Sequence, residues 1–316
     1  MEPNNVSAHK LTYSANTGQV LAILMRNVLF NIITLGIYNF WGKTRLRKFL
    51  LSQLSLNGES FVYLGNGKEL CKGFFKIILI VSLPIIILTV IGNALSMAEV
   101  MQNIVSFIVI ILIVCGKFLA MRYRMSRTTW HGIRFRMSGK VMKYALTVSY
   151  CWLMKCISFG LLIPSMDIKR LTYLSDNSYY GSLKFDCQMA KDGLFKVNLI
   201  TLLLAIPTVG LSRCWYNAAL LNNYFAGLSI GGVSMKSSFT GGALAKFYLL
   251  NMLIIMLTLG IGMPLIAHRK MAFMAPNIWF EGDIASLKAQ QSAEILAKSG
   301  EGLESVLGDG SDLGIL

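Results

Sequence analysis

Five arginines lie within 15 residues near the middle of the chain, and no Asp or Glu interrupts residues 122–136. An arginine guanidinium can bind a phosphate or carboxylate through two parallel hydrogen bonds. Aromatic side chains lie between these cations, so the stretch is a candidate site for an anionic solute or lipid. Anchoring of the chain at a membrane interface is the favoured interpretation of the same residues. The five residues are Arg122, Arg124, Arg127, Arg134 and Arg136.

A second polar group lies inside the first long apolar run. Asn27 and Asn31 are four residues apart, so they share one face of a helix. With Arg26 they form an intramembrane polar stripe, which is a candidate functional site. The alternative is that Arg26 extends to the interface and the asparagines bond to neighbouring helices. Further candidates of this kind are Lys155, Asn198 and Asn251.

A basic and aromatic cluster directly follows that apolar run. Such a cluster is typical of the cytoplasmic end of a membrane helix, where rings and cations meet lipid headgroups. No groove-reading element accompanies it, so nucleic acid is not expected as a partner. Membrane lipids with anionic headgroups are the expected partners, and a homo-oligomer or a protein partner stays open. The predicted interface anchors are Trp41, Lys43, Arg45, Arg47, Lys48, Lys76, Trp130, Lys196 and Lys246.

The residue types that carry catalysis or bind metals do not gather into motifs. The six cysteines include no C-x-x-C pair, and the three histidines are scattered. No Ser/His/Asp set and no phosphate-binding glycine loop is present. We therefore predict no catalytic residue, no metal site, no cofactor and no enzymatic activity.

The composition predicts that these residues act in or on a lipid bilayer. Hydrophobic residues make up 54% of the 316 residues and charged residues only 14%, whereas a soluble domain has about 25% charged residues. The mean hydropathy is +0.57. The net charge of +15 suits an anionic membrane surface.

Long apolar runs predict the elements that position the candidate sites. A membrane span needs about 20 mostly apolar residues, and about six runs qualify. Between them, residues 61–63 and 133–137 alternate as in half-buried strands. The predicted fold is an all-α, polytopic integral membrane protein with short β-hairpins between its spans. The predicted spans are residues 20–41, 75–95, 103–121, 142–163, 194–212 and 243–266.

Recurring glycines after the apolar runs indicate degenerate internal repeats, with the last three glycines 50 residues apart. A repeated glycine indicates a turn that other residues adopt poorly. One span per unit would point successive units to opposite sides of the membrane, as in inverted-repeat transporters. The alternative is that the interrupted helices are re-entrant, which would place every β-hairpin on one side. The glycines are Gly36, Gly160, Gly210 and Gly260.

The chain is predicted to have two parts. Residues 1–282 form the membrane domain of repeated span-plus-hairpin units. Acidic residues outnumber basic ones in residues 283–316, which are expected to form a short helix followed by disorder.

Two phrases of the sequence carry a family resemblance. "ITLGIYNFWGKTRLRKFLLSQLSLNGESFVYLGNGKELCKGF" at residues 33–74 and "RYRMSRTTWHGIRFRMSGK" at 122–140 closely resemble the YjgN family of bacterial inner-membrane proteins. The resemblance covers most of residues 10–285, and the chain departs from it at Phe40, where the family usually has proline. It implies a multi-pass protein of the bacterial inner membrane and assigns no catalytic residue.

Two function hypotheses follow. The first is a transporter or channel-like protein for an anionic solute or lipid, which the interrupted helices and the arginine-rich stretch support. The alternative is a non-transporting membrane scaffold or lipid-binding module. A continuous polar cavity that reaches the membrane midplane would favour the first hypothesis.

Overall fold

The strands of the chain form one antiparallel sheet of 11 strands in a computed structural model, which describes residues 8–191, 193–284 and 287. In space the strands follow the order β3-β2-β1-β11-β10-β9-β8-β7-β6-β5-β4. The strands are β1 (Ala8–Tyr13), β2 (Leu54–Leu56), β3 (Glu59–Ser60), β4 (Val62–Tyr63), β5 (Thr128–Trp130), β6 (Ile133–Met137), β7 (Ser178–Tyr180), β8 (Leu183–Cys187), β9 (Leu228–Ile230), β10 (Val233–Ser237) and β11 (Ile278–Glu281).

The sheet is nearly closed into a barrel. Its two edge strands, β3 and β4, are separated in sequence by Phe61 alone, so the chain itself joins the two edges. The Phe61 N–H donates to the carbonyl of Leu54 at 3.0 Å. Side chains alternate between the two faces of each strand. Trp130, Tyr180 and Ile230 are accordingly buried on the inner face.

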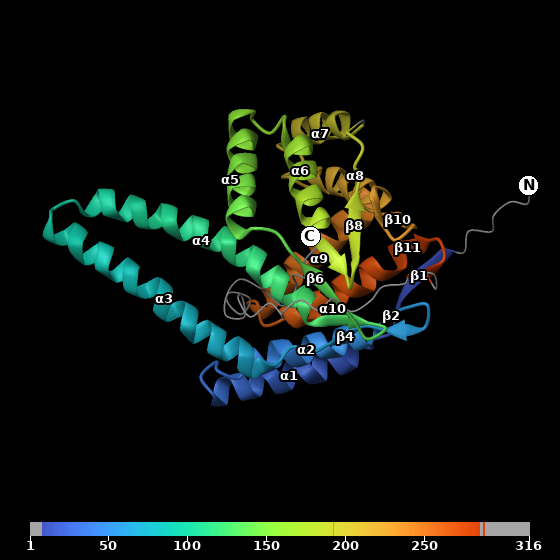
Figure 1. The fold of residues 1–316 in the computed structure, drawn as a ribbon, viewed down its shortest axis with the longest axis horizontal. Helices are drawn as coiled ribbons and strands as arrows, with labels where there is room; N and C mark the ends of the chain where they lie inside the picture. The colour runs from blue at the N-terminus through green and yellow to red at the C-terminus, as the bar shows by residue number, and fades with distance from the viewer. Residues whose placement is uncertain (1–7, 192, 285–286, 288–316) are drawn as a thin grey trace, which may run out of the picture.

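The helices of the described residues form five hairpins that alternate with the strands along the chain. The α3/α4 hairpin projects beyond the rest of the chain (Figure 1). Its helices have 28 and 29 residues and are therefore about 42 Å long, which exceeds the bilayer hydrocarbon thickness of about 30 Å. The helices are α1 (Thr17–Ile33), α2 (Asn39–Ser52), α3 (Gly67–Ala94), α4 (Ala98–Ser126), α5 (Val141–Ile157), α6 (Ile163–Asp176), α7 (Leu194–Leu203), α8 (Arg213–Ala226), α9 (Gly241–Thr258) and α10 (Met263–Met274), followed by the 3-10 turn η1 (Ala275–Asn277).

The prediction of an all-α fold with about six spans is wrong. The described part of the chain contains an 11-stranded sheet and three helices long and apolar enough to cross a membrane, namely α3, α4 and α9. Three of the predicted spans, 20–41, 142–163 and 243–266, instead cover most of one helix, a reversing turn and the start of the next helix. The predicted span 194–212 covers α7 and the turn that follows it. Apolar residues continue through these turns, so the sequence pattern could not separate a reversal from a crossing.

A pair of left-handed residues reverses the chain in the α1/α2 hairpin. Leu35 and Gly36 have φ values of 49° and 88°. The Gly36 N–H closes the turn by donating to the carbonyl of Asn31 at 2.7 Å. Glycine adopts this conformation freely, whereas a leucine is strained there. The same pair occurs at Phe159–Gly160, Val209–Gly210 and Leu259–Gly260.

The apolar residues at these turns are almost fully exposed in the protein. The exposed fraction is 93% for Leu35, 89% for Phe159, 91% for Val209 and 92% for Leu259. Exposed apolar surface of this kind marks a contact with a membrane or another protein. The turns are therefore expected to face lipid.

The β-hairpins lie on one side of any bilayer that α3 and α4 cross. Strands β6 and β7 come from segments that inverted repeats would place on opposite sides, yet they pair directly, with Phe135 opposite Tyr180. Paired strands lie about 4.8 Å apart, whereas the hydrocarbon core of a bilayer is about 30 Å thick, so two loops whose strands pair directly cannot lie on opposite sides of it. This pairing contradicts the inverted-repeat interpretation and favours the re-entrant alternative. The predicted helix and disorder of the acidic tail lie outside the described residues.

Candidate functional site

The sheet and the helices packed on it surround a partly open cavity of about 380 Å³. Most of its wall is apolar, and it includes an aromatic cluster. The ring centroids of Phe61 and Trp130 are 6.1 Å apart, and those of Phe135 and Tyr180 are 5.0 Å apart. Burial raises the pKa of Tyr180 to about 12, so its hydroxyl stays protonated and donates to the Trp130 carbonyl at 3.0 Å. The cavity therefore suits an apolar guest.

Three cationic residues also line this cavity, and each comes from a different helix. They are Arg47 on α2, Arg124 on α4 and Lys270 on α10. Arg47 is 5% exposed and Lys270 is 8% exposed. Among the described lining residues there is no Asp or Glu. The described wall of the cavity therefore combines apolar surface with three cationic side chains.

A small core cluster brings Arg47 and Lys270 to the same place. Leu46 and Leu50 of α2 pack with Val20 of α1 and Ala267 of α10. Arg47 follows Leu46 directly, and Lys270 lies one helical turn after Ala267, so the cluster fixes the backbone that carries both cations.

The backbone around Arg124 is fixed by contacts on either side of it. The fully buried Tyr123 donates its hydroxyl to Glu69 at 2.9 Å. Arg127, one turn further on, forms a 2.9 Å ion pair with the same carboxylate. The end of α4 is thereby held against the start of α3.

The sequence analysis did not identify Lys270 as a site residue. It lies just after the predicted span 243–266, in a segment without any conspicuous motif. The available signal was its spacing: Ala267, Met271 and Met274 mark one apolar helix face, and Lys270 lies beside them. A single lysine on an apolar helix face is unusual, and this pattern could have identified Lys270 as a candidate site residue.

Of the predicted arginine site, only Arg124 lines the cavity. Arg122 donates to a backbone carbonyl at Gly139, and its guanidinium lies 5.0 Å from the ring centroid of Phe118. Arg134 and Arg136 lie in β6, where Arg136 is stacked over a tyrosine ring of β7 at 4.3 Å. The sequence cluster is therefore divided between structural contacts and the cavity.

The polar stripe of the first predicted span does not reach the cavity. Asn27 is buried and donates to the carbonyl of Gly42 on α2 at 3.3 Å. The side-chain oxygen of Asn31 is buried and has no hydrogen bond within the described residues. Arg26 is exposed. Asn27 thus connects the two helices of its hairpin.

The predicted interface anchors divide into buried and exposed residues. Trp130 and Arg47 are each 5% exposed and line the cavity, so they do not lie at an outer surface. Trp41 and Lys43 are half-buried. The exposed members are Arg45, Lys48, Lys76, Lys196 and Lys246.

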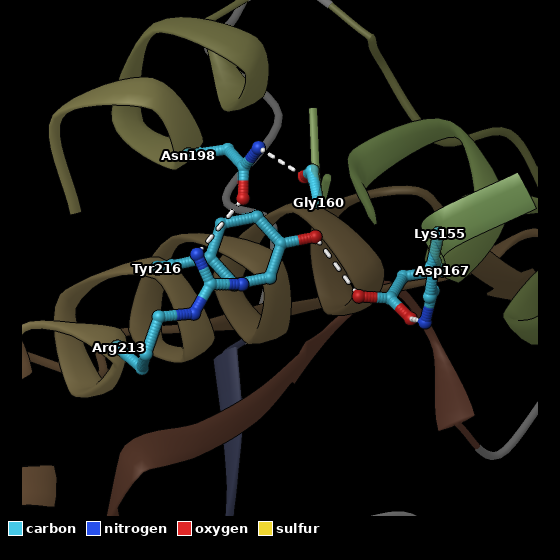
Figure 2. A network of polar contacts seen from close by, with 6 residues as sticks. All are labelled: Lys155, Gly160, Asp167, Asn198, Arg213 and Tyr216. Atoms are coloured by element: carbon cyan, nitrogen blue, oxygen red, sulfur yellow. Dashed lines mark hydrogen bonds and ion pairs between the residues drawn. The ribbon is translucent and has the colours of Figure 1, made fainter. Parts of the chain in front are cut away.

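A buried carboxylate connects three of the helices (Figure 2). Asp167 on α6 accepts a hydrogen bond from the Lys155 ammonium group of α5 at 2.5 Å. Its other oxygen accepts from the Tyr216 hydroxyl of α8 at 3.0 Å. These contacts join the α5/α6 hairpin to the α7/α8 hairpin.

Asparagine–arginine contacts connect the helices within two further hairpins. Arg213 on α8 donates to Asn198 on α7 at 2.9 Å, and Asn198 donates to the turn carbonyl of Gly160 at 3.0 Å (Figure 2). Arg269 on α10 donates to Asn251 on α9 at 2.9 Å. The polar residues Lys155, Asn198 and Asn251 of the apolar runs thus form hydrogen bonds that connect neighbouring helices. No group of three or more possible metal ligands occurs among the described residues.

Comparison with protein-family models identifies the family of this chain. A family model described as "Bacterial protein of unknown function (DUF898)" matches residues 8–212 and 198–306. The chain belongs to the DUF898 family. Both the strands of the sheet and the helices that carry the cavity cations lie within the matched residues.

This DUF898 protein is also similar to curated proteins named "Inner membrane protein YjgN". It is 27% identical over 131 residues to the protein of Escherichia coli O157:H7, covering 42% of this chain and 31% of the relative. It is 24% identical over 132 residues to that of Salmonella typhimurium, covering 40% and 31%. The match therefore spans about a third of these relatives. No solved structure matches the chain significantly.

A buried histidine makes the stability of this DUF898 protein depend on pH. His268 contacts the Tyr13 hydroxyl at 2.9 Å and the Thr17 hydroxyl at 3.2 Å. Burial, and then the neighbouring Arg269, lower the pKa of His268 below its usual value of 6.5. The unfolded chain therefore binds the proton at a higher pH than the folded chain does. The stabilisation is present above the unfolded pKa and is lost as the pH falls below it.

We expect the melting temperature to fall between about pH 7.5 and about pH 5.5, within the range where histidine titrates. His268→Gln should reduce this dependence in thermal unfolding of the detergent-solubilised protein. The exposed His131 provides the control, because His131→Gln should leave the slope unchanged. An unchanged slope in His268→Gln would show that other groups control the pH dependence.

Proposed function

We propose that this DUF898 protein is a lipid-binding module of the bacterial inner membrane, which holds a lipid-derived molecule inside its sheet. The similar curated proteins are named inner membrane proteins, and α3 and α4 are long and apolar enough to cross a bilayer. The shorter hairpins, with exposed apolar turns such as Leu35 and Val209, enter the same bilayer from the side of the sheet. The sheet then lies at the membrane surface.

The cavity is the observation that carries this proposal. Its volume of about 380 Å³ lies within the range of about 300–1,000 Å³ that is typical of ligand pockets. Its apolar wall matches an alkyl chain better than a hydrated solute. Inverted repeats were one of the features that favoured the transport hypothesis, and the β6–β7 pairing removes that feature. A binding module is therefore the preferred function.

Photo-crosslinking in lipid nanodiscs tests the proposal with the full chain. The probe is a long alkyl chain that carries a diazirine, supplied both as a fatty acid and as the corresponding alcohol. We expect at least one of the two probes to form adducts with inward-facing residues such as Phe135 and Met235, mapped by mass spectrometry. Adducts confined to α3, α4 and the exposed turns would contradict the proposal.

A pair of methionine variants controls for general lipid contact. Met235 lines the cavity, whereas Met142 on α5 is 61% exposed. Met235→Trp should fill part of the cavity and remove most of the interior adducts. Met142→Trp adds the same side chain outside the cavity and should leave the interior adducts unchanged. Equal losses in both variants would contradict binding inside the sheet.

A further inference from the structure

We propose that Ile284 and Leu287 form a movable plug, which closes one end of the cavity and is displaced when a guest enters or leaves. This inference rests on the proposed lipid-binding function and adds the regulation of the same site. It is drawn from the direction of the strands, from the place of the two side chains and from the way in which they are held.

The two ends of the barrel differ. The hairpins β5/β6, β7/β8 and β9/β10 are each connected to helices at one end and reverse in a short turn at the other. The hairpins are aligned, since Met137, which leads to α5, pairs with Ser178, which follows α6. The turns therefore lie together at the end opposite the helices, which we call the turn end. Strand β11 runs toward the turn end and stops at Glu281, so the segment after it begins there.

A glycine bends the chain as it leaves β11. Gly282 has a φ of +130°, which residues with a side chain rarely adopt. A Cβ on Gly282 would lie 3.2 Å from the Cα of Val233 and 3.3 Å from the carbonyl oxygen of Gly232. The backbone thus passes directly against the β9–β10 turn. The absence of a side chain at this position allows the segment to bend toward the interior of the barrel.

The two side chains of the plug lie in the wall of the cavity. Ile284 is 5% exposed and belongs to the main core cluster, and Leu287 is half-buried against the same cluster. Both residues line the cavity. A Cβ on Gly231 would lie 2.7 Å from Leu287 Cδ2, so Leu287 fills the space beside that glycine. Gly231 belongs to the β9–β10 turn, and the plug therefore closes the turn end.

The plug can move without disturbing the sheet. The pairings of β11 with β1 and with β10 end at Glu281, before the plug begins. The Leu287 N–H donates to the Ile284 carbonyl at 3.2 Å, so the two residues are expected to move together. The opposite end of the cavity is lined by helices such as α4 and α10, and opening it would separate packed helices. The turn end is therefore the route that a guest opens at the lower cost.

Release of a bound probe tests the plug in the full chain. The protein in nanodiscs is loaded with a diazirine probe that labels the interior, and an excess of dodecanol is added. Samples are irradiated at intervals to measure the interior adducts that remain. Leu287→Ser should accelerate release about tenfold, the ratio that corresponds to about half the contribution of a fully buried leucine. Leu287→Phe enlarges the plug and should slow release.

Leu220 on α8 provides the matched control. It is also a half-buried leucine packed on the main core cluster, but it is not among the described residues that line the cavity. Leu220→Ser should therefore remove a similar apolar contact and leave the release rate unchanged. Equal acceleration by the two serine variants would show that Leu287 acts only through the stability of the fold, and would overturn the proposal.

Water access provides a second readout that needs no guest. Met235 on β10 lines the cavity, and hydrogen peroxide oxidises an accessible methionine to its sulfoxide. Mass spectrometry should find faster oxidation of Met235 in Leu287→Ser than in the unchanged protein or in Leu220→Ser. If no probe labels the interior while oxidation responds in this way, the proposed function fails and closure by the plug stands. If the probes label the interior while neither release nor oxidation responds to Leu287→Ser, the plug is ruled out and lipid binding stands.

Discussion

Replacing Asp167 with leucine is expected to lower the free energy of unfolding by about 3 kcal/mol. The carboxylate accepts hydrogen bonds from Lys155 and from the Tyr216 hydroxyl (Figure 2). Removing it leaves a charge and a hydroxyl without this acceptor between packed helices. Breaking one side of a buried ion pair costs about 3–5 kcal/mol. The lower value applies because the Lys155 side chain remains 29% exposed.

An exposed ion pair of the same protein provides the control. Lys236 and Glu281 are 2.7 Å apart, and their side chains are 52% and 25% exposed. Water screens this pair, so Glu281→Leu should cost much less than Asp167→Leu. Unfolding of both variants by a denaturant in detergent gives the comparison. Equal losses would show that Asp167 contributes no more than a surface residue.

The second large effect is expected for Gly227→Ala, which should cost about 1–3 kcal/mol or more through overpacking. Gly227 follows α8 directly and has a φ of −86°, so the backbone conformation is not the obstacle. A Cβ placed there would lie 2.4 Å from the carbonyl oxygen and 2.8 Å from the carbonyl carbon of Gln188. This neighbour is backbone, and the Gln188 N–H also donates to the Gly227 carbonyl at 2.8 Å. Relief would therefore require separating α8 from the end of β8.

Gly242→Ala is the matched control for this substitution. A Cβ on Gly242, near the start of α9, meets no atom within 4 Å. Alanine also favours a helix more than glycine does, so the variant should be neutral or slightly more stable. Thermal unfolding of the two variants measures the difference. Similar melting temperatures would contradict the predicted clash at Gly227.

Part of this architecture could be predicted from the sequence because it depends on local patterns. The apolar runs of α3 and α4 exceed the length of a bilayer crossing, and alternation marked the strand residues 133–137. The turn glycines were also visible, because a left-handed turn at Gly36 or Gly260 leaves glycine as the unstrained residue, although the reversal of the chain there was not. Each of these features depends on residues that are close together in the sequence, so a local sequence pattern is enough to predict it.

The sheet could not be predicted, because its pairings join residues that are far apart in the sequence. His9 pairs with Phe280, and Tyr63 pairs with Thr128. Nothing local distinguishes a strand that forms an isolated hairpin from one that joins a common sheet. The burial of Trp130 follows from this closure, since the same residue on an isolated hairpin would face the interface.

The candidate site depends on the same long-range assembly. The sequence predicted Arg47 to be one cation of an interface cluster. Its burial depends on the packing of α2 against α1 and α10, and α10 is far from it in the sequence. Arg124 was singled out for its neighbours in sequence, whereas its partners in the cavity are Arg47 and Lys270. The residue types were informative, but their grouping required the fold.

The pairing of β1 with β11 has a consequence for how the protein is made. Residues 8–10 meet residues 279–281, so the first strand needs the last one as its neighbour. A ribosome adds about 5–20 residues per second, which delays this meeting by about 15–60 s. The helical hairpins emerge during that interval, while the sheet still lacks the strand that joins its two halves. A nascent chain that stops before residue 278 therefore lacks β11, the strand that pairs with both β1 and β10.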